Sequence, residues 1–384
     1  MDMVYKLIEK KVDKKQEMER IIPIAQPLIG EEEMRNVENV LRSGMLAQGE
    51  VVEEFERQFA RYIGVKFAVA TNSGTSALHT ALASLGICKN DDVITTDFSF
   101  ISGASSILLQ GAKPVFCDID PMTYNISVDV LEETITKKTR AIVPVHLYGQ
   151  PCEIDSIMEL AEEHDLLVIE DACQAHGARY YNKMVGSIGD VGVFSFYPTK
   201  NMTTGEGGML TTNNEEVATK ARMIRNHGQS SRYLHKVLGY NYRMTNLAAA
   251  IGVEQLRRLD EFNEMRIRNA AFLTRHINKT GVSCPRKKDY VKHVFHQFTI
   301  RVDEGFPLSR DELVDYLGKK GIGCGIYYPL PIHRQPLFQN LGYVDDNVNC
   351  PVACALSEEV VSLPVHPGLN HDDLRYIIDC INMV

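Results

Sequence analysis

Residues 141–170, AIVPVHLYGQPCEIDSIMELAEEHDLLVIE, decide the fold of this chain. An apolar run opens the stretch at 141–147, an amphipathic stretch of helical length follows, and a second apolar run, LLVIE, ends it at 166–170. Two short apolar strands joined by a helix are the unit from which parallel sheets are built. Residues 141–170 therefore predict an α/β domain.

The same alternation extends toward the N-terminus. Apolar runs lie at 66–70, 92–95 and 114–119, and stretches of helical length and period separate them. Strands that are apolar throughout are covered on both faces, so we expect a largely parallel sheet between layers of helices. From Glu31 on, two helices that each end in a glycine precede the first strand.

Beyond Glu170 the pattern changes. GDVGVFSF and GGMLTTN predict two strands around the polar segment YPTKNMTTGE, and helices are expected near 214–227 and 245–275. The remainder mixes strands such as HQFTIRV with helices such as SRDELVDYLGKKG. We expect a charged extension at 1–21, a large α/β domain at 22–275 and a small α+β domain at 276–384.

Composition and charge exclude several classes of protein. The 41 basic and 50 acidic residues give a net charge of −9, which argues against general nucleic-acid binding. No stretch approaches the ~18 apolar residues of a membrane span, and the N-terminus lacks the apolar run of a signal peptide. The nine cysteines include no CxxC pair, so neither a zinc site nor a disulfide framework is indicated. We expect a cytoplasmic protein with no metal and no membrane partner.

A turn of small residues, TNSGTS at 71–76, lies between a predicted strand and a predicted helix. The N-terminus of a helix offers free backbone N–H groups and the positive end of the helix dipole, and the hydroxyls of Thr75 and Ser76 add further donors. The turn is a candidate phosphate site that includes Gly74. Serine and threonine also favour this position as plain helix caps, so the turn alone does not decide.

An acidic residue, Asp171, follows the strand LLVIE where the strand leaves the sheet. That edge of an α/β sheet is where ligands bind. The carboxylate is suited to pair with a protonated pyridine nitrogen, but it is equally suited to a metal, a ribose or the capping of a turn. Gln174 and His176 keep the following segment polar.

One lysine, Lys200, follows the strand GDVGVFSF, with Ser195 five residues before it and a glycine-rich turn, GEGG, after it. Most lysines are surface charges. An amine in a dry pocket has a lowered pKa and can form a Schiff base. A phosphate cradle, an acid at a strand end and a lysine on a loop are together the parts that an enzyme dependent on pyridoxal phosphate (PLP) needs.

Five motifs occur in order: TNSGTSALHTAL, DFSFISGASSILLQGAKPVFCDID, EDACQAHGA, GDVGVFSFYPTKNMTTGEGGM and GYNYRMTNLAAAIGVEQL. They closely resemble the DegT/DnrJ/EryC1/StrS family of PLP-dependent sugar aminotransferases. The resemblance runs from about Ile22 into the C-terminal part and is weakest in the last hundred residues. It implies the fold of aspartate aminotransferase (fold type I) and a homodimer with active sites at the subunit interface.

The resemblance also implies roles around the cofactor. Lys200 would form the Schiff base, and Asp171 would pair with the pyridine nitrogen. The remaining cofactor contacts within one subunit would be those to the phosphate (Gly74, Thr75, Ser195), to the ring hydroxyl (Gln174) and to the two faces of the ring (Phe100, Ala172).

Further roles concern the partner subunit and the substrate. The resemblance implies that Asn241 reaches the phosphate in the partner subunit and that Arg243 helps to bind a substrate carboxylate. Tyr328 and His333 match the rim of the sugar site. For His176 we expect a structural role.

The function that the resemblance implies is transfer of an amino group from glutamate or glutamine to a nucleotide-linked keto-sugar, by a ping-pong mechanism, in a pathway such as polysaccharide biosynthesis. A cyclitol or another ketone as acceptor, and a PLP-binding regulator without catalysis, stay open as alternatives. One branch of the family has histidine in place of the lysine and catalyses dehydration, which Lys200 disfavours. A nicotinamide oxidoreductase is disfavoured because GIGCG at 321–325 continues with Ile326 where a dinucleotide fingerprint needs glycine.

Overall fold

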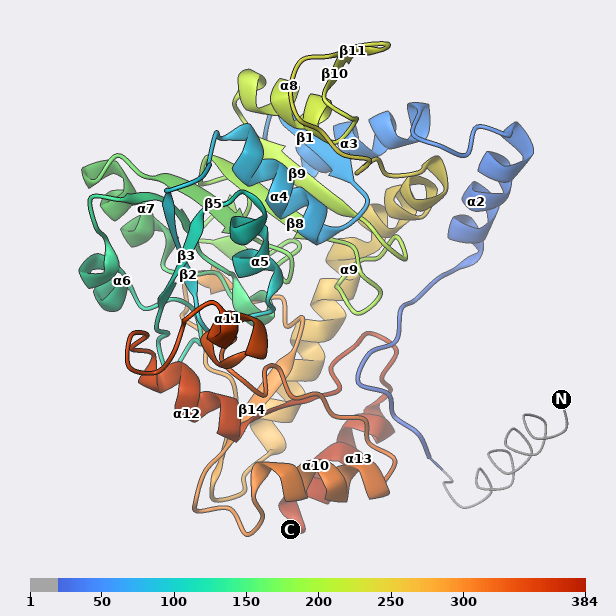
Figure 1. Cartoon of the computed structure of the whole chain (residues 1–384). Helices are drawn as coiled ribbons and strands as arrows, with labels where there is room; N and C mark the ends of the chain where they lie inside the picture. The colour runs from blue at the N-terminus through green and yellow to red at the C-terminus, as the bar shows by residue number, and fades with distance from the viewer. Residues whose placement is uncertain (1–19) are drawn as a thin grey trace, which may run out of the picture.

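The computed structural model describes residues 20–384, so nearly all of the extension expected at 1–21 lies outside the described residues. A seven-stranded sheet forms the centre, in the order β1-β9-β8-β5-β4-β2-β3 (Figure 1). Its strands are β1 (Phe67–Thr71), β2 (Asp92–Thr96), β3 (Lys113–Cys117), β4 (Thr139–Val143), β5 (Leu167–Asp171), β8 (Val191–Ser195) and β9 (Gly208–Thr212). Neighbouring strands are parallel except where β9 pairs with β1 and β8. The expected α/β fold with a largely parallel sheet is confirmed.

The limits of one strand differ from the expectation. The apolar run at 141–147 predicts a longer strand, but β4 ends at Val143. The next residue is Pro144, which has no N–H to donate to a neighbouring strand. Beyond Pro144 the chain turns into a short 3₁₀ helix, η2 (Leu147–Gly149), which brings Tyr148 beside the candidate site.

Helices cover both faces of the sheet. One face packs against α4 (Gly74–Ser84) and α8 (Glu215–Ile224), with α5 (Ser102–Leu109) beside α4. The other face packs against α3 (Glu50–Ile63), α6 (Val128–Thr134), α7 (Ile154–Glu163) and α9 (Asn246–His276). Successive residues of β1 point to opposite faces of the sheet. Val69 packs on the face covered by α4 and α8, and Ala68 and Ala70 pack on the face covered by α3 and α9.

Helix α9 joins the central sheet to the C-terminal region (Figure 1). Its N-terminal half packs Leu256 and Leu259 beside the sheet, and its C-terminal end packs Leu273 in a separate core. That second core is built from β14 (Phe298–Val302), β15 (Val360–Leu363), α10 (Arg310–Lys319) and α13 (His371–Asn382). The domain limits expected at 22–275 and 276–384 stay a prediction.

Part of the C-terminal region returns to the central sheet. Three short helices, η3 (Ile332–Arg334), α11 (Pro336–Asn340) and α12 (Pro351–Glu359), lie beside α5 and the ends of β2 and β3 (Figure 1). Phe338 packs against Phe116 with a distance of 5.3 Å between ring centroids. This contact sets the C-terminal region beside the carboxyl end of β3.

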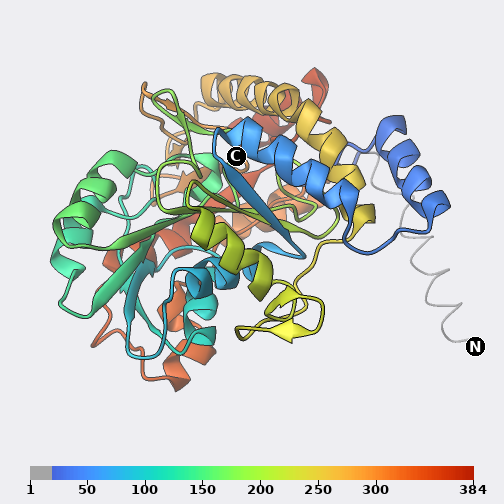
Figure 2. The same cartoon turned by 90° about the horizontal axis from the view of Figure 1, so that it is seen from above.

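The remaining elements lie at the periphery. Helix α2 (Glu31–Ser43) packs on α9, and the hairpin of β10 (Gln229–Ser231) and β11 (Leu234–His235) projects from the end of α8, as both views show (Figures 1 and 2). Small ladders are formed by β6 (Arg179–Tyr180), β7 (Lys183–Met184), β12 (Val282–Ser283) and β13 (Val291–Lys292). Within residues 20–384, none of the helices combines the length and the apolar character that a membrane crossing requires.

Candidate active site

A cavity of about 780 Å³ opens at the carboxyl ends of β1, β5 and β8. Eight of the site residues expected from the sequence line it: Gly74, Thr75, Phe100, Asp171, Gln174, Ser195, Lys200 and Tyr328. Segments more than a hundred residues apart in the chain therefore meet at one edge of the sheet. That edge is where open α/β sheets bind their ligands.

The first turn of α4 forms one wall of the cavity. Ser73 caps the helix, because its hydroxyl accepts a hydrogen bond from the N–H of Ser76 at 3.1 Å. The N–H groups of Gly74 and Thr75, at the first two positions of the helix, have no acceptor within the helix. A Cβ on residue 74 would lie 2.7 Å from the Cβ of Ser195. Glycine at position 74 thus lets Ser195 lie beside the free N–H groups.

Asp171 and Lys200 form the floor of the cavity, where Asp171 is buried and Lys200 is half-buried. Burial raises the pKa of Asp171, while the Cys173 N–H, which donates to this carboxylate at 3.0 Å, and the charge of Lys200 oppose the rise. Burial also lowers the pKa of Lys200, although Cys173 and Asp171 hold it partly up. The amine is therefore more readily neutral than an ordinary lysine, as a nucleophile or a base must be.

A histidine that the sequence analysis missed, His296, contacts the lysine. Its Nε2 lies 3.5 Å from the Nζ of Lys200, and among the described residues its Nδ1 has no hydrogen-bond partner. Burial, with Lys200 and Arg266 nearby, lowers the pKa of His296 well below its ordinary value, so the ring is neutral. The signal in the sequence is a polar pair, His296-Gln297, directly before the apolar strand β14.

Gln174 is held in place by the surrounding backbone and one tyrosine. Its Oε1 accepts from the N–H of Tyr148 at 2.9 Å, and its Nε2 donates to the hydroxyl of Tyr328 at 3.2 Å. The Tyr148 hydroxyl in turn donates to the carbonyl of Tyr327. The wall formed by Tyr327 and Tyr328 is thereby tied to the end of β5. Phe100, more than half exposed, lies across from it, 6.3 Å from Tyr328 between ring centroids.

The neighbour of Asp171 in the strand, Glu170, points to the other face of the sheet, where both oxygens of its carboxylate accept hydrogen bonds. It accepts hydrogen bonds from the N–H groups of Gly186, Ile188 and Gly189 at 2.7–2.8 Å and from His146 at 3.1 Å. Burial by itself raises the pKa of Glu170, but these donors lower it below its ordinary value. Glu170 therefore anchors the strand end, and Asp171 is the carboxylate left for a ligand.

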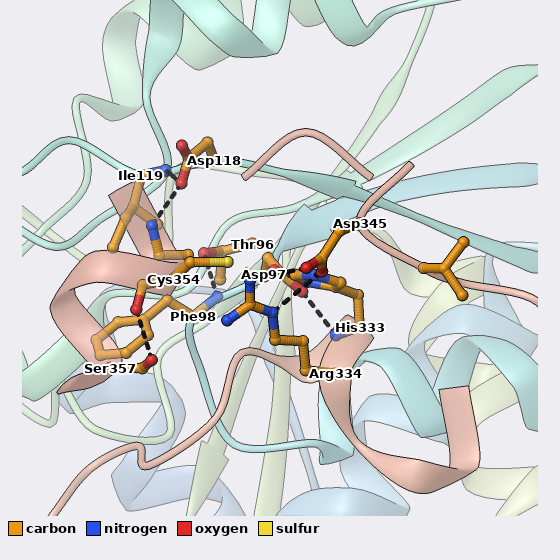
Figure 3. Close-up of polar contacts among 12 residues, drawn as sticks. Thr96, Asp97, Phe98, Asp118, Ile119, His333, Arg334, Asp345, Cys354 and Ser357 are labelled. Carbon is orange, nitrogen blue, oxygen red and sulfur yellow. Dashed lines mark hydrogen bonds and ion pairs between the residues drawn. The ribbon is translucent and has the colours of Figure 1, made fainter. Parts of the chain in front are cut away.

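Four expected site residues do not line the cavity. Ala172 is buried behind it, and Asn241 is exposed near α8, where its backbone bridges to Asn226. Arg243 donates to the side chain of Asn226 at 2.7 Å. His333, expected at the rim of the sugar site, is instead buried between Asp97 and Asp345 (Figure 3). The two carboxylates explain the position of His333, because they bind both of its ring nitrogens.

His176 has the surroundings of a core side chain. Its ring is almost fully buried and lies 5.5 Å from Phe194 and 5.7 Å from Phe196 between ring centroids. Burial lowers its pKa to about 3. A neutral ring packed between two phenylalanines agrees with the expected structural role.

Residues 27–382 match the model of the DegT/DnrJ/EryC1/StrS aminotransferase family. The chain belongs to this family. It is an aminotransferase by family, and its fold is that of the PLP-dependent aminotransferases. The resemblance found in the five sequence motifs is thus confirmed over nearly the whole chain.

Two curated relatives show the range of names within the family. The chain is 43% identical to the "Pleiotropic regulatory protein" of Geobacillus stearothermophilus over 352 residues, which cover 91% of this chain and 93% of the relative. It is 40% identical to the GDP-perosamine synthase of Caulobacter vibrioides over 372 residues, covering 96% of this chain and 99% of the relative. Both matches extend over almost the full length of each protein.

Solved structures are similar along the whole chain, at lower identity. S. venezuelae DesV, crystallised with a ketimine intermediate, superposes with a TM-score of 0.89 at 34% identity and covers 94% of this chain and 98% of its own. Spr1654 of Streptococcus pneumoniae, in a structure described as the PLP-form, has a TM-score of 0.88 at 29% identity, with 95% and 98% covered. These aminotransferases share the fold of this chain along its length.

Proposed function

We propose that this aminotransferase uses PLP to move an amino group from glutamate or glutamine to a nucleotide-linked keto-sugar. The observation that carries the proposal is the pair of Lys200 and Asp171 on the floor of a cavity whose wall contains the free N–H groups of the first turn of α4. The names of relatives, GDP-perosamine synthase and the PLP-form of Spr1654, support the substrate class and the cofactor.

The residues of the cavity fit PLP. The free N–H groups of Gly74 and Thr75 and the hydroxyl of Ser195 would hold its phosphate. Asp171 would meet the ring nitrogen, and Gln174 would lie beside the ring hydroxyl. A carboxylate with a raised pKa gains most from a cationic partner, and a protonated pyridine is such a partner. Phe100 and Ala172 would contact the two faces of the ring.

When bound, PLP supplies an electron sink for charge that develops on the substrate. Asp171 holds a proton at the ring nitrogen. Lys200, with its lowered pKa, would remove a proton from the substrate carbon and return it to the cofactor carbon. A positioned general base of this kind is worth about 10²–10⁴ in rate. Neutral His296 accepts a hydrogen bond from the lysine amine without adding a second positive charge. One site serves both substrates in turn, so ping-pong kinetics follow.

We propose a homodimer as the working form. Large apolar side chains are exposed on α2, on the segment after it and on the hairpin β10–β11: Met34, Leu41, Met45, Leu46, Tyr233, Leu234 and Leu238. A second subunit packed on these segments would remove the apolar side chains from water. Asn241 and Arg243 lie near the hairpin, outside the cavity of their own subunit, and would act across that interface. The cytoplasmic location also stays a prediction.

The proposal is tested by adding L-glutamate to the PLP-loaded protein and following the cofactor absorbance. A shift to the pyridoxamine form, reversed by one member of a panel of UDP-, dTDP- and GDP-linked keto-sugars, is the expected result. Conversion by glutamate with no reversal by the panel would point to a cyclitol or another ketone. PLP binding with no spectral change on glutamate or glutamine would favour the regulator, the role that the name of the Geobacillus relative suggests for that protein.

A further inference from the structure

The cavity wall formed by Tyr327 and Tyr328 is anchored at its far end by a cluster of charges that the proposed reaction does not use. We propose that His333 is a positioning residue: as a cation held between Asp97 and Asp345, it clamps the Tyr327–Tyr328 wall onto the carboxyl end of β2 (Figure 3). The chemistry of the wall depends on the proposed function, but the clamp itself does not.

The geometry favours protons on both ring nitrogens of His333. Nδ1 faces Oδ2 of Asp97 in a short contact, and Nε2 lies 2.8 Å from Oδ1 of Asp345. A neutral imidazole has one N–H and would direct the lone pair of its other nitrogen at a carboxylate. The imidazolium form donates to both carboxylates, so a cation is the species that fits.

The buried partner has no substitute for this cation. Asp97 is fully buried, and its other oxygen accepts from the N–H of His333 itself at 2.9 Å. A buried carboxylate that loses its partner is strongly destabilising. The backbone carbonyl of Asp97 also accepts a hydrogen bond from the N–H of Ile332 at 2.8 Å, so three contacts join residue 97 to residues 332–333.

Short chain segments connect the clamp to both walls of the cavity. Tyr328 is followed by Pro329-Leu330-Pro331 and then by η3, and prolines restrict the backbone of this short connector. On the other side, Asp97 is three residues before Phe100, the aromatic residue that lines the opposite wall. Residues 97 and 333 therefore hold the two walls at a set distance from each other.

A second aspartate supports the same segment from the next strand. Asp118 (Figure 3) follows β3. Its carboxylate accepts from the N–H groups of Val352 and Ala353 at 2.9 Å each, at the N-terminus of α12. A carboxylate at a helix N-terminus is favoured by the helix dipole. The contacts of Asp118 are to backbone N–H groups and need no protonated side chain. The contact in this region that depends on a histidine proton is the one at His333.

The charged and titratable groups around the ring fix the direction of its pH response. They are Asp97 after β2, Asp118 after β3, the thiols of Cys350 and Cys354 at α12, and Arg334 and Asp345 from its own segment. Burial by itself lowers the pKa of His333, but Asp97 and Asp345 outweigh burial and hold the pKa above its ordinary value. The clamp is closed below this raised pKa and loosens as the pH rises through it.

The test is hydrogen exchange of the full-length protein with His333→Gln, Asp345→Asn and a control, Asp155→Asn. Asp155 lies in an exposed pair with Lys183, remote from the cavity. His333→Gln should reduce the exchange protection of residues 327–334 at least about tenfold, because it removes the cation from a buried carboxylate. Asp155→Asn should leave that protection unchanged.

Asp345→Asn keeps the test decisive if His333→Gln fails to fold. Asp345 is exposed, so its loss should spare the fold, lower the pKa of His333 as measured by NMR titration, and shift the loss of protection at 327–334 to lower pH by the same amount. An unchanged exchange profile in both variants, or a wild-type His333 that titrates at or below about 6.5, would overturn the clamp. Neither readout requires PLP or turnover, so failure of the clamp and failure of the proposed function are separate results.

Discussion

The two regions that shape the cavity each contain a buried histidine, and the two histidines differ in charge. His296 on the floor is 5% exposed and faces the amine of Lys200, whereas His333 in the clamp is 1% exposed and lies between two carboxylates. The pKa of His296 is lowered and that of His333 is raised. His296 lies deeper in the protein and beside positive charge, and both lower its pKa, whereas two carboxylates outweigh burial at His333.

The two regions also differ in how their buried aspartates are paired. Asp97 and Asp171 both follow or end a parallel strand, and burial raises the pKa of each. Asp97 has a histidine cation in direct contact, while Asp171 accepts the N–H of Cys173 and feels the charge of Lys200. In the clamp, the charges of His333, Asp97 and Asp345 are already paired with one another. Under the proposed function, a bound cationic ring would complete the floor.

The largest effect that separates the regions concerns these two carboxylates. Asp171→Asn should lower turnover by about 10²–10⁴, because an amide does not hold a proton at the ring nitrogen. The matched change Asp97→Asn should lower turnover less than about tenfold, since Asp97 only positions a wall. Steady-state rates with L-glutamate and the accepted keto-sugar give both values. Near-normal turnover of Asp171→Asn would contradict the role of the floor.

The next effect concerns the close approach of Gly74, in the cavity wall, to Ser195. Gly74→Ala places a Cβ 2.7 Å from that of Ser195, so we expect a loss of about 1–3 kcal/mol in the free energy of unfolding and weaker PLP binding. Gly318→Ala is the matched control, because nothing lies within 4 Å of its Cβ and the residue is in helix α10. It should raise stability by up to about 1 kcal/mol. Urea unfolding and PLP titration measure both.

Equal PLP affinity for Gly74→Ala and the wild type would break this part of the comparison. The first turn of α4 would then be a plain helix cap, the alternative that the sequence left open.

The smallest effect is the pH dependence of stability, and its sign differs between the two histidines. The folded-state pKa of His296 is lowered, so below about pH 6.5 the unfolded chain binds a proton that folded His296 does not, and stability falls by up to about 1.4 kcal/mol per pH unit. The folded-state pKa of His333 is raised, so its contribution is complete below about pH 6.5 and is lost as the pH rises through the raised value.

Variants isolate these two contributions. His296→Gln should remove part of the acid-side loss of stability, and His333→Gln should remove part of the alkaline-side loss. Urea midpoints across the pH range, taken as differences from the wild type, measure both. Slopes of the same sign for the two variants would contradict the assignment of charge.

Much of the floor could be predicted from the sequence, because its residues follow strands that are apolar throughout. Asp171 and Lys200 each follow such a strand, and parallel strands bring their carboxyl ends to one edge. His296 was missed because it reaches the lysine from a segment 96 residues further along the chain. No local periodicity encodes such a contact.

The clamp could not be predicted for the same reason. Asp97 and His333 are 236 residues apart, and long-range contacts such as the packing of Phe338 on Phe116 bring their segments together. The motif around His333 indicated proximity to the sugar site, but not that two carboxylates would bind its ring. Pro144 was visible in the sequence and ends β4, yet the continuous apolar run at 141–147 concealed the turn.

The central claim is that Lys200, above Asp171, is the residue that joins PLP covalently. The direct measurement is borohydride reduction of the PLP-loaded protein, followed by proteolysis and mass spectrometry, with Lys200→Ala as the control. The account predicts a reduced pyridoxyl group on the peptide that contains Lys200, and no such group on any peptide of the variant. A pyridoxyl group on another lysine of the wild type, or its persistence in Lys200→Ala, would contradict the account.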